Sequence, residues 1–169
     1  MDNYAEHILE KKIGTSQMLA MIGAIMLTIS GVIVLWMIKF GIGVIIIAVG
    51  AFLIFVAKEN MSLEYEYEFT NGDCDIAKII NKASRKEKYK FSAGEVTRVL
   101  PYNSEKFQNE LDVNAKMHVL DYTSGYEENN ENWYAFITSV ANEDKAIILE
   151  LNEKCLEHVK VVYRQKFEK

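Results

Sequence analysis

The amino-acid sequence predicts an α-helical membrane hairpin followed by an α+β soluble domain. Residues 18–57 are almost entirely apolar and contain one charged side chain, Lys39. Residues 62–70 alternate between apolar and acidic side chains, as expected of a half-buried β-strand. More short strand patterns follow, and an amphipathic helix closes the sequence. These features divide the chain into an arm of residues 1–17, the hairpin, and a domain of residues 58–169.

The apolar segment has the length of two membrane crossings. One crossing of the hydrocarbon core takes about 20 apolar residues, because each helical residue rises about 1.5 Å. We therefore expect spans at residues 18–38 and 40–57, with a tight turn at Lys39. Trp36 and Lys39 have the chemistry of interface anchors. A signal peptide is the alternative, but the first apolar run exceeds the usual length of about 7–15 residues, and a second run follows directly.

Small residues in the two spans predict close packing of helices. Glycine lets helix backbones approach each other in lipid, where no hydrophobic force drives helices together. Gly23 and Gly31 lie in the first span, and Gly43 and Gly50 lie in the second. We expect these four glycines to make transmembrane packing contacts, within the hairpin or against the spans of another membrane protein.

Basic residues flank the hairpin. Lys11 and Lys12 precede it and Lys58 follows it. An excess of Lys and Arg marks the cytoplasmic side of a membrane protein. We therefore expect a two-pass protein of the cell membrane with both termini in the cytoplasm. The scattered apolar residues of the arm predict a short amphipathic helix at the membrane interface.

Residues 58–169 predict about seven short strands and a final helix. Asn71-Gly72 is the strongest short signal for a two-residue hairpin turn. Ser104 is placed to cap a short helix, and Asn152 to cap a final helix that reaches Lys166. The expected strands are residues 62–70, 73–80, 85–91, 95–100, 116–122, 133–140 and 145–151.

Three features carry a resemblance to known proteins. They are the arm from Tyr4 to Lys12, the hairpin, and the segment that runs from Glu64 through Asn71-Gly72 to Lys90. With the order of strands and closing helix, they resemble a bacterial family of small two-span membrane proteins with a pleckstrin-homology-like (PH-like) domain. The resemblance implies a bent antiparallel barrel closed by a C-terminal helix. It implies architecture and location, and no reaction.

Composition argues against several classes of function. The net charge is −5, mostly from the domain, which disfavours nucleic acid because that binding depends on neutralising phosphates. Cys74 and Cys155 lie far apart, as do His7, His118 and His158, so we expect reduced core thiols, no disulfide and no metal site. No nucleophile or metalloprotease motif is present. We expect no catalytic residue, no cofactor and no enzymatic activity.

A group of basic residues is conspicuous in this acidic domain. Anionic lipid headgroups attract such residues by about 1 kcal/mol each near the membrane surface. In eukaryotic PH domains the corresponding loop can bind phosphoinositides, so the resemblance also favours lipid. The alternative is a solvated strand face that pairs with Glu64, Glu66 and Glu68 across the sheet. The six basic residues are Lys78, Lys82, Arg85, Lys86, Lys88 and Lys90.

These observations favour a non-enzymatic interaction or scaffold module at the inner surface of the cell membrane. Its partner would be an anionic lipid headgroup or a protein. The alternative is an accessory subunit of a transporter or envelope complex, which docks through its transmembrane hairpin.

Overall fold

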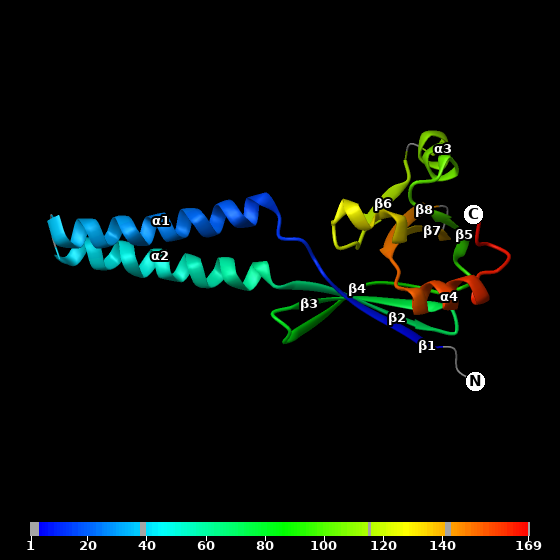
Figure 1. The fold of residues 1–169 in the computed structure, drawn as a ribbon, viewed down its shortest axis with the longest axis horizontal. Helices are drawn as coiled ribbons and strands as arrows, with labels where there is room; N and C mark the ends of the chain where they lie inside the picture. Colours follow the sequence, from blue (N-terminus) through cyan, green and yellow to red (C-terminus); the bar gives the residue numbers. More distant parts are fainter. Residues whose placement is uncertain (1–3, 38–39, 115, 141–142, 169) are drawn as a thin grey trace. The chain divides into compact units, whose positions relative to one another are not determined.

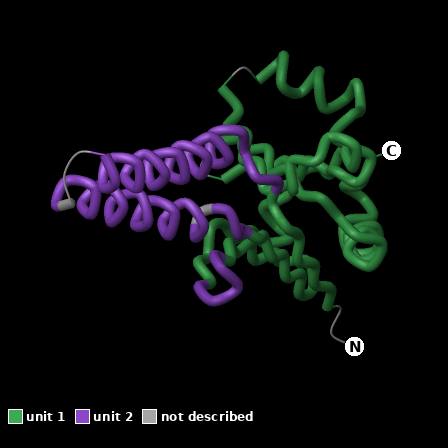
Figure 2. The backbone as a smooth tube through the Cα atoms, turned by 60° about the vertical axis from the view of Figure 1, so that its left-hand side comes forward, with its two compact units in different colours: residues 1–11, 64–79, 85–169 green, residues 12–63, 80–84 purple. Residues whose placement is uncertain are grey.

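The computed structural model describes residues 4–37, 40–114, 116–140 and 143–168 (Figure 1). Lys39, the predicted turn anchor, lies outside these ranges. The chain forms two compact units (Figure 2). The helical unit comprises Lys12–Leu63 and Ile80–Ser84, and the β-rich unit comprises Met1–Lys11, Glu64–Ile79 and Arg85–Lys169.

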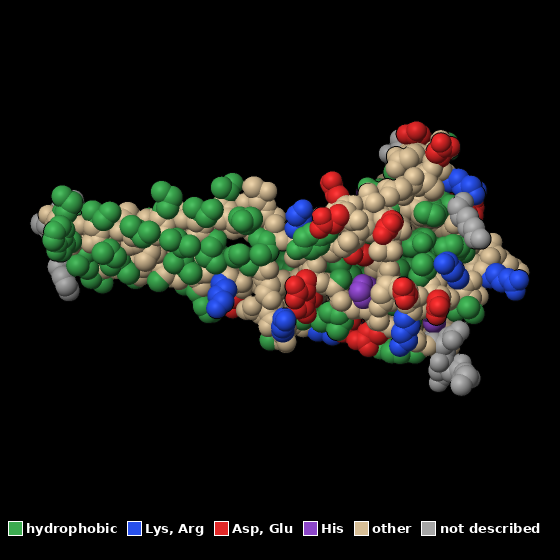
Figure 3. Space-filling view, in the orientation of Figure 1, with side chains coloured by type: hydrophobic (Ala, Val, Ile, Leu, Met, Phe, Trp, Pro, Cys, Tyr) green, Lys and Arg blue, Asp and Glu red, His purple; other side chains and the backbone are tan. Residues whose placement is uncertain are grey.

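The helical unit is a hairpin of α1 (Thr15–Met37) and α2 (Phe40–Met61) (Figure 1). The 23 residues of α1 rise about 35 Å, which exceeds the hydrocarbon thickness of about 30 Å. By length and composition, both helices can cross a membrane. Their outward surface is mostly apolar, and hydrophobic side chains line the face of the hairpin that Figure 3 shows. The predicted spans fall within α1 and α2 wherever the structure describes them.

Sheet A of the β-rich unit has four strands in the order β1-β2-β3-β4. At the turn between β2 and β3, Asn71 has φ 52° and Gly72 has φ 97°. Both angles lie in the left-handed region that a type I′ turn requires, so the predicted hairpin is confirmed. The strands are β1 (Tyr4–Glu10), β2 (Leu63–Thr70), β3 (Asp73–Ile80) and β4 (Ser84–Phe91).

The N-terminal arm contains a β-strand, so the predicted interfacial helix is wrong. β1 pairs antiparallel with β2, and Glu10 lies opposite Glu64. Ala5 and Leu9 are buried in the core, whereas Ile8 is exposed. Pairing with a strand more than fifty residues away decides the structure here, and it overrides the weak local pattern. Residues 58–169 alone therefore lack one strand of sheet A.

Sheet B has four strands in the order β5-β7-β8-β6. β7 pairs antiparallel with β5 and β8, but β6 pairs parallel with β8, which departs from the fully antiparallel expectation. The cause is the crossover through η1 (Glu127–Asn132), which carries the chain from one edge of the sheet past β8. The strands are β5 (Val96–Pro101), β6 (His118–Asp121), β7 (Trp133–Val140) and β8 (Glu143–Glu150).

Two capped helices complete the β-rich unit. The Ser104 side chain accepts a hydrogen bond from the backbone of α3 (Glu105–Val113), and Asn152 does the same for α4 (Glu153–Val162), as predicted. α4 ends before Lys166, earlier than its sequence indicates. The larger core contains residues from both sheets and α4, including Tyr67, Phe69, Phe91, Phe136, Ile147, Leu149, Val159 and Tyr163. A smaller core lies between sheet B and α3.

Candidate functional site

Lys11 and Lys78 approach each other across one end of sheet A. The Lys11 ammonium lies 3.3 Å from the Tyr65 hydroxyl and 5.0 Å from the centre of its ring. Tyr65 lies opposite Leu9 in the register of β1 and β2. On the other side of β2, counting back from the two-residue turn at Asn71-Gly72 places Lys78 opposite Tyr65. Tyr65 therefore lies between two cationic side chains, Lys11 just after β1 and Lys78 on β3.

Lys86 and Lys88 add two more positive charges to this end of the sheet. Both are exposed on β4. Burial lowers the pKa of Lys78, and the charges of Lys88, Lys11 and Lys86 lower it further. We call Lys11, Lys78, Lys86 and Lys88 the lysine cluster. A group of like charges at this spacing favours binding of an anion, because an anion relieves the repulsion.

Arg85 and Lys90 differ from the lysine cluster, because carboxylates on the same sheet neutralise them. Arg85 forms ion pairs with Glu66 and, at 3.6 Å, with Glu68. Lys90 lies 2.8 Å from Asp75. The predicted pairing between the acidic and basic strands is thus confirmed for Glu66 and Glu68.

The remaining members of the two predicted charge groups lie apart from these pairs. Glu64 lies opposite Glu10 in the register of β1 and β2. Lys82 is exposed in the turn between β3 and β4, where its φ is 55°. The structure therefore divides the six predicted basic residues into three cluster members, two ion-paired residues and one turn residue.

Lys11 is the member of the cluster that sequence reasoning did not place with the others. It lies 67 positions before Lys78 along the chain, and it joins the cluster only because β1 pairs with β2. The signal that points to it is the strand-like burial of the arm, in which Ala5 and Leu9 are buried and His7 between them is half-buried.

Three of the four predicted packing glycines lie in the contact between α1 and α2. A Cβ atom built on Gly31, Gly43 or Gly50 would lie within 3.0 Å of the other helix's backbone. The backbone atoms concerned belong to Ile47, Leu35 and Thr28, respectively. Glycine at these positions is what permits the two backbones to approach.

Gly23 does not lie in this contact, so its predicted packing role, against the span of another protein, stays a prediction. No atom lies within 4 Å of a Cβ built there, whereas the neighbouring Ala24 is 4% exposed. Ala24 precedes Gly31 by seven positions, as Gly43 precedes Gly50. Two helical turns separate such residues, so they share one face, while Gly23 points about 100° away from it.

A buried carboxylate organises the loop between β6 and β7. Glu150 is 9% exposed, and it accepts hydrogen bonds from Ser124 N at 3.0 Å, Trp133 Nε1 at 3.1 Å and Asn129 Nδ2 at 3.3 Å. The Ser124 hydroxyl donates to the same carboxylate. Several donors stabilise a buried charge, so this cluster fixes the loop. Ser124 is 3% exposed, which keeps its hydroxyl from a substrate.

The cysteines are buried and free, as predicted. Burial raises the pKa of Cys155 to about 11, so its thiol is unreactive at neutral pH. His7 shares a contact of 3.2 Å between its Nδ1 and Asn152 Nδ2. Within the described ranges, no group of three or more His, Cys, Asp or Glu side chains is arranged to hold a metal ion.

Comparison with known protein families decides the classification. A family model described as a bacterial PH-like domain (DUF6106) matches residues 1–169. The chain belongs to this bacterial PH-like domain family. Two four-stranded sheets and the closing helix α4 agree with that membership, and they confirm the predicted fold class of a helical hairpin with a PH-like domain. Searches of curated proteins and of solved structures found no match.

Membership of the bacterial PH-like domain family fits the position of the hairpin in this chain. The match runs through α1 and α2 as well as the two sheets. The two apolar helices therefore belong to the family's architecture. They are compatible with a protein that is associated with a membrane.

Proposed function

We propose that this protein is a membrane-anchored interaction module of the cell membrane. The hairpin of α1 and α2 spans the membrane twice, and the lysine cluster holds the PH-like domain against anionic lipid headgroups. The observation that carries this proposal is the division of the basic residues. Arg85 and Lys90 are neutralised within the sheet, whereas the charges of Lys78, Lys86 and Lys88 form no ion pair within the residues that the structure describes.

The pairing of β1 with β2 supports two crossings. Residues that are hydrogen-bonded in one sheet must lie on the same side of a membrane, so residues 11–62 cross it an even number of times. A cleaved signal peptide is disfavoured for the same reason, because the strand that precedes α1 belongs to the domain. The lysines of the arm favour the cytoplasm for that side under the positive-inside rule.

The energetics of the lysine cluster support an anionic lipid as its ligand. Each basic residue near an anionic membrane surface contributes about 1 kcal/mol, so four lysines contribute about 4 kcal/mol. The hairpin already restricts the domain to the surface, so this attraction sets the domain's orientation. Because the attraction is electrostatic, it weakens as added salt shortens the Debye length below about 8 Å.

The accessory-subunit alternative loses support from the glycine positions. Gly31, Gly43 and Gly50 lie inside the hairpin's own contact, so they are not available to another span. Gly23 remains on the outward surface. The lipid-oriented module is therefore the function that we favour.

The proposal is tested with the full chain in lipid nanodiscs. A fluorophore on a cysteine introduced at Ser84, which is exposed at the start of β4, serves as donor to acceptors on labelled headgroups. We expect higher energy transfer in discs that contain phosphatidylglycerol than in phosphatidylcholine alone, and a loss of this difference in 1 M salt. Replacement of Lys11, Lys78, Lys86 and Lys88 by Gln should remove it at low salt as well.

A matched control removes charge that is already paired. The double variant Lys90→Gln with Asp75→Asn leaves the net charge unchanged and deletes one ion pair. It should behave like the wild-type chain. Equal energy transfer from the wild-type chain in the two kinds of disc would rule out orientation by anionic lipid.

A further inference from the structure

The β5 edge of sheet B is occupied by a segment near the C-terminus. The backbone N–H of Val99 donates to the carbonyl of Lys166 at 2.8 Å, and the N–H of Glu168 donates to the carbonyl of Val99 at 3.0 Å. Phe167 forms a parallel bridge with Val99. An edge strand presents unpaired backbone groups that readily pair with an added strand. Residues 166–168, here called the tail segment, pair with β5 in this way.

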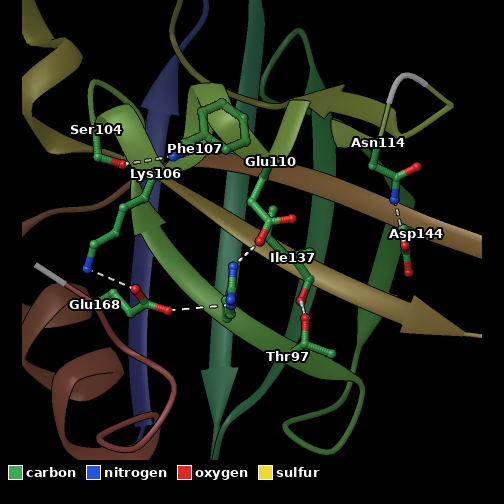
Figure 4. Close-up of polar contacts among 10 residues, drawn as sticks. Thr97, Ser104, Lys106, Phe107, Glu110, Asn114, Ile137, Asp144 and Glu168 are labelled. Atoms are coloured by element: carbon green, nitrogen blue, oxygen red, sulfur yellow. Dashed lines mark hydrogen bonds and ion pairs between the residues drawn. The ribbon is translucent and has the colours of Figure 1, made fainter. Parts of the chain in front are cut away.

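The side chains of Phe167 and Glu168 also contact the rest of the domain. The Phe167 ring lies against Tyr134, with 5.7 Å between ring centres. The Glu168 carboxylate lies 2.9 Å from the Lys106 ammonium and 3.5 Å from Arg98 Nε. These charges lower the pKa of Glu168, with the hydrogen bond from Lys106 as the largest cause. Figure 4 shows Lys106 and Glu168 facing each other beside Glu110, which forms an ion pair with Arg98.

A groove adjoins the docked tail segment. It has a volume of about 310 Å³, and its lining includes Val113, an apolar side chain at the end of α3 that is 87% exposed. The groove thus combines two cations, an exposed apolar side chain and the β5 edge. Its other lining residues are Arg98, Lys106, Asn109, Glu110 and Glu168.

The contacts of the tail segment are of a kind that a competitor can displace. Two backbone hydrogen bonds join it to β5, and ion pairs between side chains that are in contact with solvent are individually weak. Addition of a strand to a sheet edge is also a recurring way for a domain to bind an extended peptide. The backbone supplies the affinity in such a site, and side-chain pockets supply the specificity.

We propose that the β5 edge and α3 form a docking site for an extended segment of a partner protein, and that the tail segment occupies this site in cis. The partner segment carries an aromatic residue that packs on Tyr134. An acidic residue follows directly and binds Arg98 and Lys106. This site lies in sheet B and does not depend on the lysine cluster of sheet A.

The test uses a fluorescent peptide with the sequence of residues 163–169 and the full chain in detergent micelles. The double variant Phe167→Ala with Glu168→Gln weakens the tail segment. We expect this variant to bind the peptide at least tenfold more tightly than the wild-type chain, because its own tail no longer competes. A peptide with Ala and Gln at the same two positions should not bind. Fluorescence anisotropy measures both affinities.

Site variants provide the control. Arg98→Gln with Lys106→Gln should abolish peptide binding, whereas Lys116→Gln with Lys154→Gln makes the same change in charge at exposed positions elsewhere and should not. Thermal denaturation checks that each variant is folded. If the double tail variant fails to fold, Glu168→Gln alone keeps Phe167 in place and should raise the affinity about threefold.

Two results would overturn the proposal. Absence of binding to the folded tail variant would show that the edge takes no segment in trans. Dimerisation of the wild-type chain that the free peptide reverses would assign the site to the tail of a second copy instead of a partner protein.

Discussion

At the scale of single residues, Gly72 shows how one position joins local and tertiary structure. Its φ of 97° satisfies the turn between β2 and β3. Its carbonyl accepts a hydrogen bond from the Tyr163 hydroxyl. A Cβ atom at this position would lie 2.5 Å from Val162 Cγ1 and 3.0 Å from Ala93 Cβ. The turn chemistry is visible in the sequence, but the contact with the end of α4 is not.

We predict that Gly72→Ala destabilises the domain by about 2 kcal/mol or more, since it combines a strained φ with overpacking. The matched control is Gly94→Ala, because the nearest atom to a Cβ built on Gly94 is 3.9 Å away. Chemical denaturation of the two variants checks the difference. Similar midpoints for both would show that the turn region relaxes without cost.

The lysine cluster illustrates the limit of residue-level prediction. The sequence shows six basic residues close together, but it does not show which of them form ion pairs. Arg85 meets Glu66 only because β2 and β4 belong to one sheet. Lys11 reaches Tyr65 only because the arm pairs with β2. The register of the strands decides which charged side chains lie close together, and therefore which charges are neutralised.

At the scale of elements, the two helices of the hairpin pack against each other through small residues. Its apolar composition predicts the two helices well, since length and hydropathy are local properties. The face along which they pack is harder to derive, because several small residues compete for it. The seven-residue spacings of Ala24 and Gly31, and of Gly43 and Gly50, match the packing face of paired helices.

We predict that Gly43→Leu separates α1 from α2, because its side chain would enter the space that Leu35 occupies. Overpacking of this kind costs about 1–3 kcal/mol. Gly23→Leu adds the same side chain on an open surface and should have little effect. The resistance of the purified chain to unfolding by SDS, followed by circular dichroism, distinguishes the two. Equal loss in both variants would contradict the packing face assigned here.

At the scale of the whole molecule, the helical hairpin is an insertion between two adjacent strands. β1 and β2 are antiparallel neighbours, and Glu10 lies directly opposite Glu64. Residues 12–62 thus take the place that a short turn has in an ordinary β-hairpin. The PH-like domain is built from both sides of the insertion, so the arm supplies one strand of sheet A.

We predict that replacing residues 12–62 by Asn-Gly yields a soluble, folded domain, because this pair closes a two-residue turn between Lys11 and Leu63. The comparison is a chain of residues 63–169, which lacks β1. The first should unfold cooperatively on heating, and the second should be much less stable or aggregate. Cooperative unfolding of both with the same midpoint would show that β1 adds nothing.

The sequence by itself determined the two apolar helices, the alternating strands, the turn at Asn71-Gly72 and the caps of α3 and α4. All of these depend on residues within a few positions of each other. Only the tertiary structure decided that the arm is a strand, that β6 is parallel to β8, and that the tail segment pairs with β5. Backbone groups of these segments find their partners far along the chain, and such pairing leaves little trace in local composition.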